Sequence, residues 1–198
     1  MISFKIKIPV PLLYVLFLLL NSCNQENDRK DVEIRGLENS TVIIKEGKTD
    51  YPEEYKKAAK LIAENKVDEA IQVYDHLLTI EKDKAAAFAG LGSCYNLKND
   101  FSNALVFYRQ SLTYDTLLMT SLIGSGSAHL ALKNYDSAKY FYNKAKWFMP
   151  EVPGSYWGLA SLYDEIGERD KAKQNAKKII DLAPNSMYRQ LMEDILRK

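Results

Sequence analysis

Apolar residues recur at intervals of three and four along two neighbouring stretches of the chain, with a short polar run at residues 98–100 between them. The positions that carry this spacing are Phe88, Leu91, Tyr95, Ala104, Tyr108 and Leu112. Such spacing places side chains on one face of a helix, and the run Lys-Asn-Asp is typical of a turn. The pattern therefore predicts two helices joined by a tight turn. One such hairpin is too small to bury its own apolar face and needs neighbours of the same kind.

The same pattern returns every 34 residues between residues 51 and 186. Five columns of equivalent residues carry it: Phe88, Leu122 and Tyr156; Gly92, Gly126 and Ala160; Tyr95, His129 and Tyr163; Ala70, Ala104, Ala138 and Ala172; and Tyr74, Tyr108 and Tyr142. They divide the chain without insertion into four units, 51–84, 85–118, 119–152 and 153–186. In its period and its residue types the chain resembles the tetratricopeptide-repeat family. The resemblance implies an all-α fold, an α-solenoid of four helix-turn-helix units.

Both ends of the array depart from the pattern in the way that terminal repeats require. Glu54 stands in a column that is apolar in the other units, and Lys57 in one that is apolar in the second and fourth. A first repeat must keep its outer side polar. After the fourth unit, one apolar stripe runs along residues 187–198, formed by Tyr188, Leu191, Met192, Ile195 and Leu196. This stripe predicts a C-terminal capping helix that covers the fourth unit.

The first 22 residues do not share the repeat pattern. Lys5 and Lys7 precede an uncharged, mostly apolar run at residues 8–20, which is shorter than the roughly 20 residues that a helix needs to cross a bilayer. A basic start followed by a short apolar run is typical of a secretory signal peptide. We expect residues 1–22 to be that signal and the polar residues 23–50 to be a flexible tether.

The sequence Leu20-Asn21-Ser22-Cys23 resembles the lipobox of bacterial lipoproteins, in which a small residue precedes a cysteine that becomes lipidated. The resemblance implies cleavage after Ser22 and acylation of Cys23, palmitate included. It makes the protein an exported lipoprotein anchored to the bacterial membrane through Cys23. We expect the outer membrane and its periplasmic side, with exposure at the cell surface as the alternative.

Charge and side-chain chemistry exclude several classes of function. The formal net charge is +1 and falls to −1 when Lys5 and Lys7 leave with the signal, which excludes the basic footprint of a nucleic-acid-binding protein. The sequence contains neither a metal-binding nor a phosphate-binding motif. His129 lies in an aromatic column, and a packing role is expected for it and for Cys94. We therefore predict no enzyme, no catalytic residue, no metal and no cofactor.

By the same resemblance, the first helix of each unit lines a concave groove. The residues assigned to this groove, where we expect a partner protein to bind, are Tyr55, Ala89, Ser93, Asn96, Ile123, Ser127, Trp157, Ser161 and Asp164. Tyr55 and Trp157 either contact that partner or pack within the array. A column of glycines next to the groove, Gly90, Gly124 and Gly158, has two readings. Either neighbouring helices approach closely there, or a partner backbone does.

The sequence favours an interaction scaffold of the bacterial cell envelope that binds a peptide or a helix of a partner protein in the groove. The alternative is an envelope lipoprotein that binds a small ligand or a glycan on its concave aromatic residues. Two surface features stay open. Trp147 and Phe148 either pack at the joint with the fourth unit or form an exposed patch. The second helix of the fourth unit has a basic side formed by Arg169, Lys171, Lys173, Lys177 and Lys178. This side is either simply solvated or contacts acidic lipid headgroups or an acidic partner.

Overall fold

The computed structural model of this 198-residue chain describes residues 53–80, 84–183 and 189–197. The predictions for residues 1–52, including the signal, Cys23 and the tether, lie outside this range. Within it the regular structure is entirely helical, as the repeat pattern predicts. The helices are α2 (Glu53–Ala63), α3 (Val67–Ile80), α4 (Ala85–Leu97), α5 (Phe101–Tyr114), α6 (Met119–Ala131), α7 (Tyr135–Phe148), α8 (Pro153–Glu165), α9 (Arg169–Leu182) and α10 (Arg189–Arg197). None of these helices is long and apolar enough to span a bilayer.

The turn inside each unit is set by one residue in the left-handed region of backbone conformation. Asn65, Asn99, Lys133 and Gly167 are 34 residues apart, and their φ angles are 61°, 60°, 59° and 80°. Asparagine and glycine tolerate this conformation better than other residues. In the second unit the next helix is then capped by Asp100, whose carboxylate accepts a hydrogen bond from the Asn103 amide at 3.2 Å. The helix-turn-helix unit is thus encoded locally.

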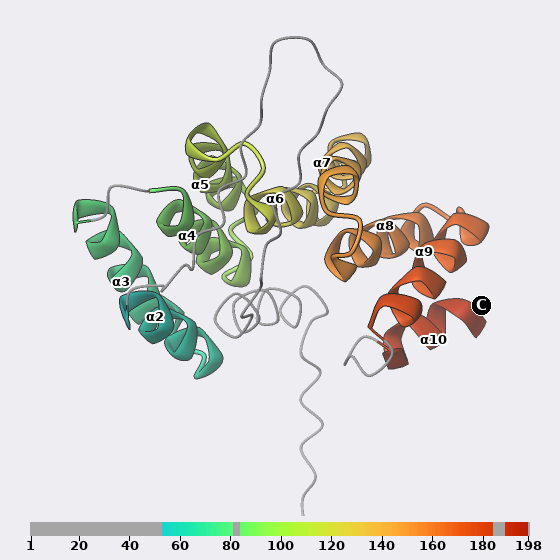
Figure 1. The fold of residues 1–198 in the computed structure, drawn as a ribbon, viewed down its shortest axis with the longest axis horizontal. Coiled ribbons are helices and arrows are strands. Elements are labelled where there is room, and N and C mark those ends of the chain that lie inside the picture. Colours follow the sequence, from blue (N-terminus) through green and yellow to red (C-terminus); the bar gives the residue numbers. More distant parts are fainter. Residues whose placement is uncertain (1–52, 81–83, 184–188, 198) are drawn as a thin grey trace, which may run out of the picture.

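The helix pairs follow one another around an arc. Figure 1 shows α4, α6 and α8 along its inner side and α5 and α7 along its outer side, with α10 packed at the C-terminal end. Each second helix lies between the first helix of its own unit and the first helix of the next, since α3 contacts both α2 and α4, and α5 contacts both α4 and α6. The result is an α-solenoid whose inner surface is made by the first helices.

A buried tyrosine fills each of the inner interfaces between repeats. The Tyr108 ring lies between α4 and α6, so close that a Cβ added to Gly92 would lie 2.6 Å from it and a Cβ added to Gly124 would lie 2.2 Å from it. Tyr142 lies in the same way between Gly126 and Gly158, at 2.6 Å and 2.1 Å. Only a residue without a side chain fits beside these rings. Of the two readings of the glycine column, close approach within the array is therefore confirmed.

At the two ends of the array the glycine column changes with the tyrosine column. In the first unit, which has no preceding repeat, the equivalent of Gly90 is Lys56, and it is exposed. After the fourth unit, where Ala176 replaces the tyrosine, the equivalent position on α10 is Met192, and it is fully buried. Ala176 and Met192 belong to the same apolar cluster. The last interface is therefore filled from the opposite side, with a large residue facing a small one.

Candidate functional site

The residues predicted to line the groove lie on the first helices α2, α4, α6 and α8, but they differ in exposure. Six of the nine are buried: Ala89, Ser93, Asn96, Ile123, Ser127 and Trp157. Tyr55, Ser161 and Asp164 are half-buried. Binding of a partner by these residues stays a prediction. Several of their side chains make contacts within the array.

Two of the serines are engaged in the repeat interfaces. The hydroxyl of Tyr108 donates a hydrogen bond to Ser93 Oγ at 3.3 Å, and Ser93 Oγ donates to the Ala89 carbonyl at 3.0 Å. The hydroxyls of Ser127 and Tyr142 are 3.1 Å apart. Burial raises the pKa of both tyrosines above the usual range, so both rings stay neutral. These serines satisfy the buried hydroxyl of the tyrosine in their own repeat.

The fourth unit lacks this arrangement, because its tyrosine position holds Ala176. Ser161, the equivalent of Ser93 and Ser127, is accordingly half-buried instead of buried. Asp164 follows Ser161 after three residues and shares its side of α8. Ser161 and Asp164 therefore bring a hydroxyl and a carboxylate together on the inner face of the last repeat.

Asn96, at the end of α4, is the unusual member of the predicted groove. Its side chain is 3% exposed, and in the part of the chain described here neither polar atom of its amide has a hydrogen-bond partner. A buried, unpaired amide costs free energy unless a partner satisfies it. The amide can donate to and accept from a peptide group, so Asn96 is chemically suited to a polypeptide ligand.

The two aromatic residues of the predicted groove pack against other side chains. The ring of Tyr55 lies 6.1 Å from the ring of Tyr74, at an interplanar angle of 59°. Trp157 is 3% exposed and belongs to the same apolar cluster as Ile123 and Leu122. Neither side chain is an open platform on which a sugar or a small aromatic ligand would stack.

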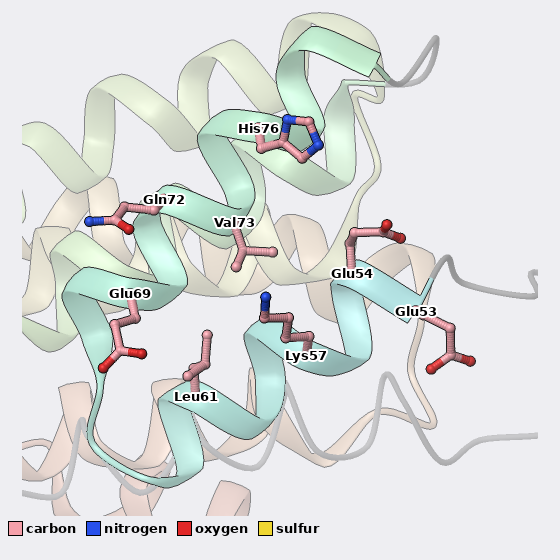
Figure 2. A pocket seen from close by; sticks show the side chains of 8 residues that line it. All are labelled: Glu53, Glu54, Lys57, Leu61, Glu69, Gln72, Val73 and His76. Carbon is pink, nitrogen blue, oxygen red and sulfur yellow. The ribbon is translucent and has the colours of Figure 1, made fainter.

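A cavity of about 600 Å³ lies at the opposite end of the array from α10, between α2 and α3. Figure 2 shows Lys57 and Leu61 of α2 facing Val73 of α3, with polar side chains around them. The polar residues of its lining are Glu53, Glu54, Lys57, Glu69, Gln72 and His76. Glu54 occupies a column that is apolar in later repeats, and Lys57 one that holds leucine in the second and fourth, so this open face is polar where an inner repeat would pack. This is the surface expected of a first repeat.

Groups that catalysis would need are held in packing environments. The ring of His129 stacks on Phe141 with centroids 5.5 Å apart, and burial lowers its pKa. Burial raises the pKa of the Cys94 thiol to about 12, which keeps it protonated. Over the described residues, histidine, cysteine and acidic side chains form no cluster of three that could hold a metal ion.

The family profile described as tetratricopeptide repeat matches residues 153–186, the span of the fourth unit. The chain is also 25% identical over 130 residues to tetratricopeptide repeat protein 12 of Homo sapiens. That alignment covers 66% of this chain but only 18% of the human protein, so the chain corresponds to a small part of this relative. The chain is a tetratricopeptide-repeat protein.

Solved structures share the fold of this tetratricopeptide-repeat array at low sequence identity. A thermophilic protein of Thermus thermophilus has a TM-score of 0.65 at 16% identity, covering 73% of this chain and 78% of its own. A repeat protein from Parabacteroides merdae has a TM-score of 0.57 at 20% identity, covering 73% and 58%. The first repeat domain of Spaghetti (RPAP3), bound to an HSP90 peptide, has a TM-score of 0.54 at 18% identity, covering 60% and 94%.

Three features of this tetratricopeptide-repeat protein were not predicted from its sequence. One is the use of Ser93 and Ser127 by the interface tyrosines. Another is the exchange of tyrosine and glycine for Ala176 and Met192 at the last interface. The columns contain both signals, because each serine recurs fifteen residues before a tyrosine and Met192 continues the glycine column. The third is the burial of Trp157, which the sequence left open beside contact with a partner, because spacing alone does not decide between the two.

Proposed function

We propose that this chain is a scaffold of the bacterial cell envelope, anchored to a membrane through Cys23, which binds a segment of a partner protein on its inner surface. The fold itself is that of a protein-interaction scaffold. Membrane anchoring and the nature of the bound segment are the proposed part.

The state of the Asn96 amide is the observation that carries the peptide-binding part of the proposal. It is a buried donor and acceptor on the inner side of the array without a hydrogen-bond partner in the described residues. An extended segment presents one N–H and one C=O per residue, and these groups match the two polar atoms of the amide. In the structure of Spaghetti (RPAP3), the related repeat domain is bound to a peptide of HSP90. That observation supports a peptide as the class of ligand.

Ser161 and Asp164 are the residues that we expect to select among side chains of the bound segment. They are the half-buried polar pair on α8, in the repeat where no tyrosine engages the serine. A carboxylate here favours a basic or amide-bearing side chain on the bound segment. We therefore expect the segment to run along α4, α6 and α8, with a donor-rich residue near Asp164.

A pull-down from solubilised membranes tests the binding proposal. The bait is the full chain, compared with the variants Asn96→Leu and Asp164→Lys. We expect both variants to lose a partner that wild type recovers, and we expect Asp75→Lys, the same charge reversal on the exposed face of α3, to recover it. Equal recovery by all four baits would contradict binding on the inner surface.

The anchor is tested separately by metabolic labelling with palmitate. We expect label on the wild-type chain and none on Cys23→Ser, together with release of the variant from the membrane fraction. Labelling of Cys23→Ser to the wild-type level would contradict acylation of Cys23. This result would leave the inner surface untouched, because Cys23 precedes the repeats.

A further inference from the structure

The outer side of α7 carries an exposed aromatic patch made of Tyr140, Trp147 and Phe148. Trp147 is 82% exposed, Tyr140 61% and Phe148 45%. Tyr140 and Trp147 are seven residues apart, so they share one side of the helix. Of the two readings for Trp147 and Phe148, packing at the joint with the fourth unit is therefore wrong, and the exposed patch is confirmed. The inner surface and the repeat interfaces use none of these three residues.

Lysines accompany this aromatic patch. Lys144 lies between Tyr140 and Trp147 on the same side of α7. Lys139 and Lys146 are turned toward the fourth repeat, where their ammonium groups lie 5.9 Å and 5.0 Å from the ring centroids of Tyr163 and Tyr156. Lys144 is thus the lysine of α7 that belongs to the aromatic patch.

The corresponding second helix of the next repeat, α9, continues the positive charge on its equivalent positions. Lys177 and Lys178, at the positions equivalent to Asn143 and Lys144, are both exposed. In the first repeat these two positions hold Asp75 and His76 instead, so the outer surface changes from acidic to basic along the array. Acidic residues also lie at this end of the array: Asp136 on α7, Glu151 after it, Glu168 at the start of α9, where it pairs with Lys171, and Asp170 and Asp181 on α9. Helix α9 still has five basic residues against two acidic ones.

We propose that the aromatic patch, with Lys144, Lys177 and Lys178, rests on an anionic lipid surface. Tryptophan and tyrosine concentrate at the boundary between lipid headgroups and acyl chains, because the ring is apolar and its N–H or O–H stays hydrated. Lysines beside them are attracted to anionic headgroups. An exposed tryptophan on a convex helix, flanked by lysines, suits a flat, negatively charged interface. The proposal rests on the proposed membrane location of the protein and is independent of what the inner surface binds.

Such a contact would orient the array. The aromatic patch lies on α7, on the outer side of the arc, while α4, α6 and α8 lie on the inner side (Figure 1). Contact through the outer side turns the inner surface away from the membrane, where a partner can reach it. A flexible tether of the length predicted for residues 23–50 keeps the array within roughly 30 Å of its anchor. At that effective concentration even a weak patch stays in contact.

Trp147 reports on this contact directly, because the chain has only two tryptophans. In the Trp157→Phe variant of the full chain, Trp147 is the single indole fluorophore. With vesicles that contain phosphatidylglycerol, we expect its emission to shift to shorter wavelength and to be quenched by brominated acyl chains. With vesicles of phosphatidylcholine alone we expect weaker quenching, and added salt should reduce the signal in the anionic vesicles.

Charge variants locate the surface. Lys144→Glu and Lys178→Glu are made in the same Trp157→Phe background. Each should raise the vesicle concentration needed for half-maximal quenching by at least about fivefold, which is the effect of losing one lysine at an anionic surface. Arg109→Glu, on the outer side of α5, is the matched control and should behave like the parent. Equal effects of Arg109→Glu and Lys144→Glu would overturn the proposed position.

Two further outcomes would overturn the proposal. In the first, the chain sediments with the vesicles but Trp147 keeps the emission of a hydrated indole, which would show that the N-terminal region alone holds it. In the second, Trp147 emission shifts with protein concentration in the absence of lipid, which would show that a second copy covers the aromatic patch. Neither outcome touches the pull-down result for Asn96 and Asp164, so failure of the lipid contact and failure of partner binding are distinguishable.

Discussion

The inner repeat interfaces and the last one solve the same packing problem with opposite residues. Between the inner repeats a large tyrosine of the second helix meets a glycine of the next unit, as Tyr108 meets Gly124. At the last interface the second helix has the small residue, Ala176, and α10 has the large one, Met192. The comparison shows that total volume is conserved while the side that supplies it changes. Because the fourth repeat has Ala176 in place of the tyrosine, the Ser161 hydroxyl has no tyrosine hydroxyl to pair with.

The largest loss of stability is expected when the methionine of the last interface is placed in an interface between inner repeats. Gly124→Met leaves Tyr108 in place, and a Cβ at position 124 already falls 2.2 Å from the Tyr108 ring. We expect the free energy of unfolding to fall by about 3 kcal/mol or more, measured by urea denaturation. Gly167→Asn is the control, because no atom lies within 4 Å of a Cβ there and its φ of +80° suits asparagine. A loss below about 1 kcal/mol for Gly124→Met would contradict the tight interface.

Exchanging both residues at the last interface tests more sharply whether the total side-chain volume of an interface is conserved. Ala176→Tyr alone overfills it and Met192→Gly alone leaves a cavity, so each should cost about 2 kcal/mol or more of unfolding free energy. The double variant rebuilds the inner type of interface and should recover part of the loss, with a coupling of about 1–3 kcal/mol. Chemical denaturation of the four proteins in the cycle measures this coupling. Strictly additive losses would show that Ala176 and Met192 do not share one space.

Removing the tyrosine hydroxyl separates ring packing from hydrogen bonding. Tyr142→Phe keeps the ring between Gly126 and Gly158 but removes the hydroxyl that lies 3.1 Å from Ser127 Oγ. We expect a loss of about 1 kcal/mol in unfolding free energy. The matched change Tyr140→Phe, on the exposed side of the same helix, should leave stability unchanged. Equal values for the two variants would mean that the buried hydroxyl contributes no net stability.

The smallest effect concerns the one histidine in an aromatic column. Burial lowers the pKa of His129 below its usual value of 6.5, so the folded state binds a proton less tightly than the unfolded state. Its stabilising contribution is therefore complete above pH 6.5 and is lost as the pH falls through that value toward the lower pKa of the folded state. His129→Tyr, which copies Tyr95 and Tyr163, should flatten the pH dependence of the melting temperature between pH 5 and 7. An unchanged slope in the variant would assign that dependence to other groups.

The fold followed from the sequence because its signals are local and repeated. The 34-residue period gave the order of the helices, and the turn residues Asn65 and Asn99 adopt the positive φ that a tight turn needs. The exposure of the inner residues could not be predicted in the same way, because it depends on neighbours far apart in sequence. Ser93 and Ser127 share a column with Ser161, yet the hydroxyls of the first two are engaged by tyrosines fifteen residues later. The column alone does not distinguish the three.

The candidate site therefore narrows from a uniform groove to two places, the end of α4 and the inner face of α8. Asn96 has an amide without a hydrogen-bond partner in the residues that the structure covers, and the fourth repeat adds the half-buried Ser161 and Asp164. The aromatic residues counted as groove residues, Tyr55 and Trp157, pack against the array. This distribution favours recognition of a polypeptide backbone with one donor-rich side chain over stacking of a sugar or small ligand.

Site-specific photo-crosslinking in living cells tests the central claim, that the inner surface of the array holds a partner polypeptide. A photoreactive residue at Ser161 should give one discrete covalent adduct with another protein, and the same residue at Gln110, on the exposed side of α5, should not. The adduct from Ser161 should disappear when Asn96→Leu is added. An adduct of the same size and yield from both positions, or none from Ser161 while the chain is folded and membrane-bound, would contradict the claim.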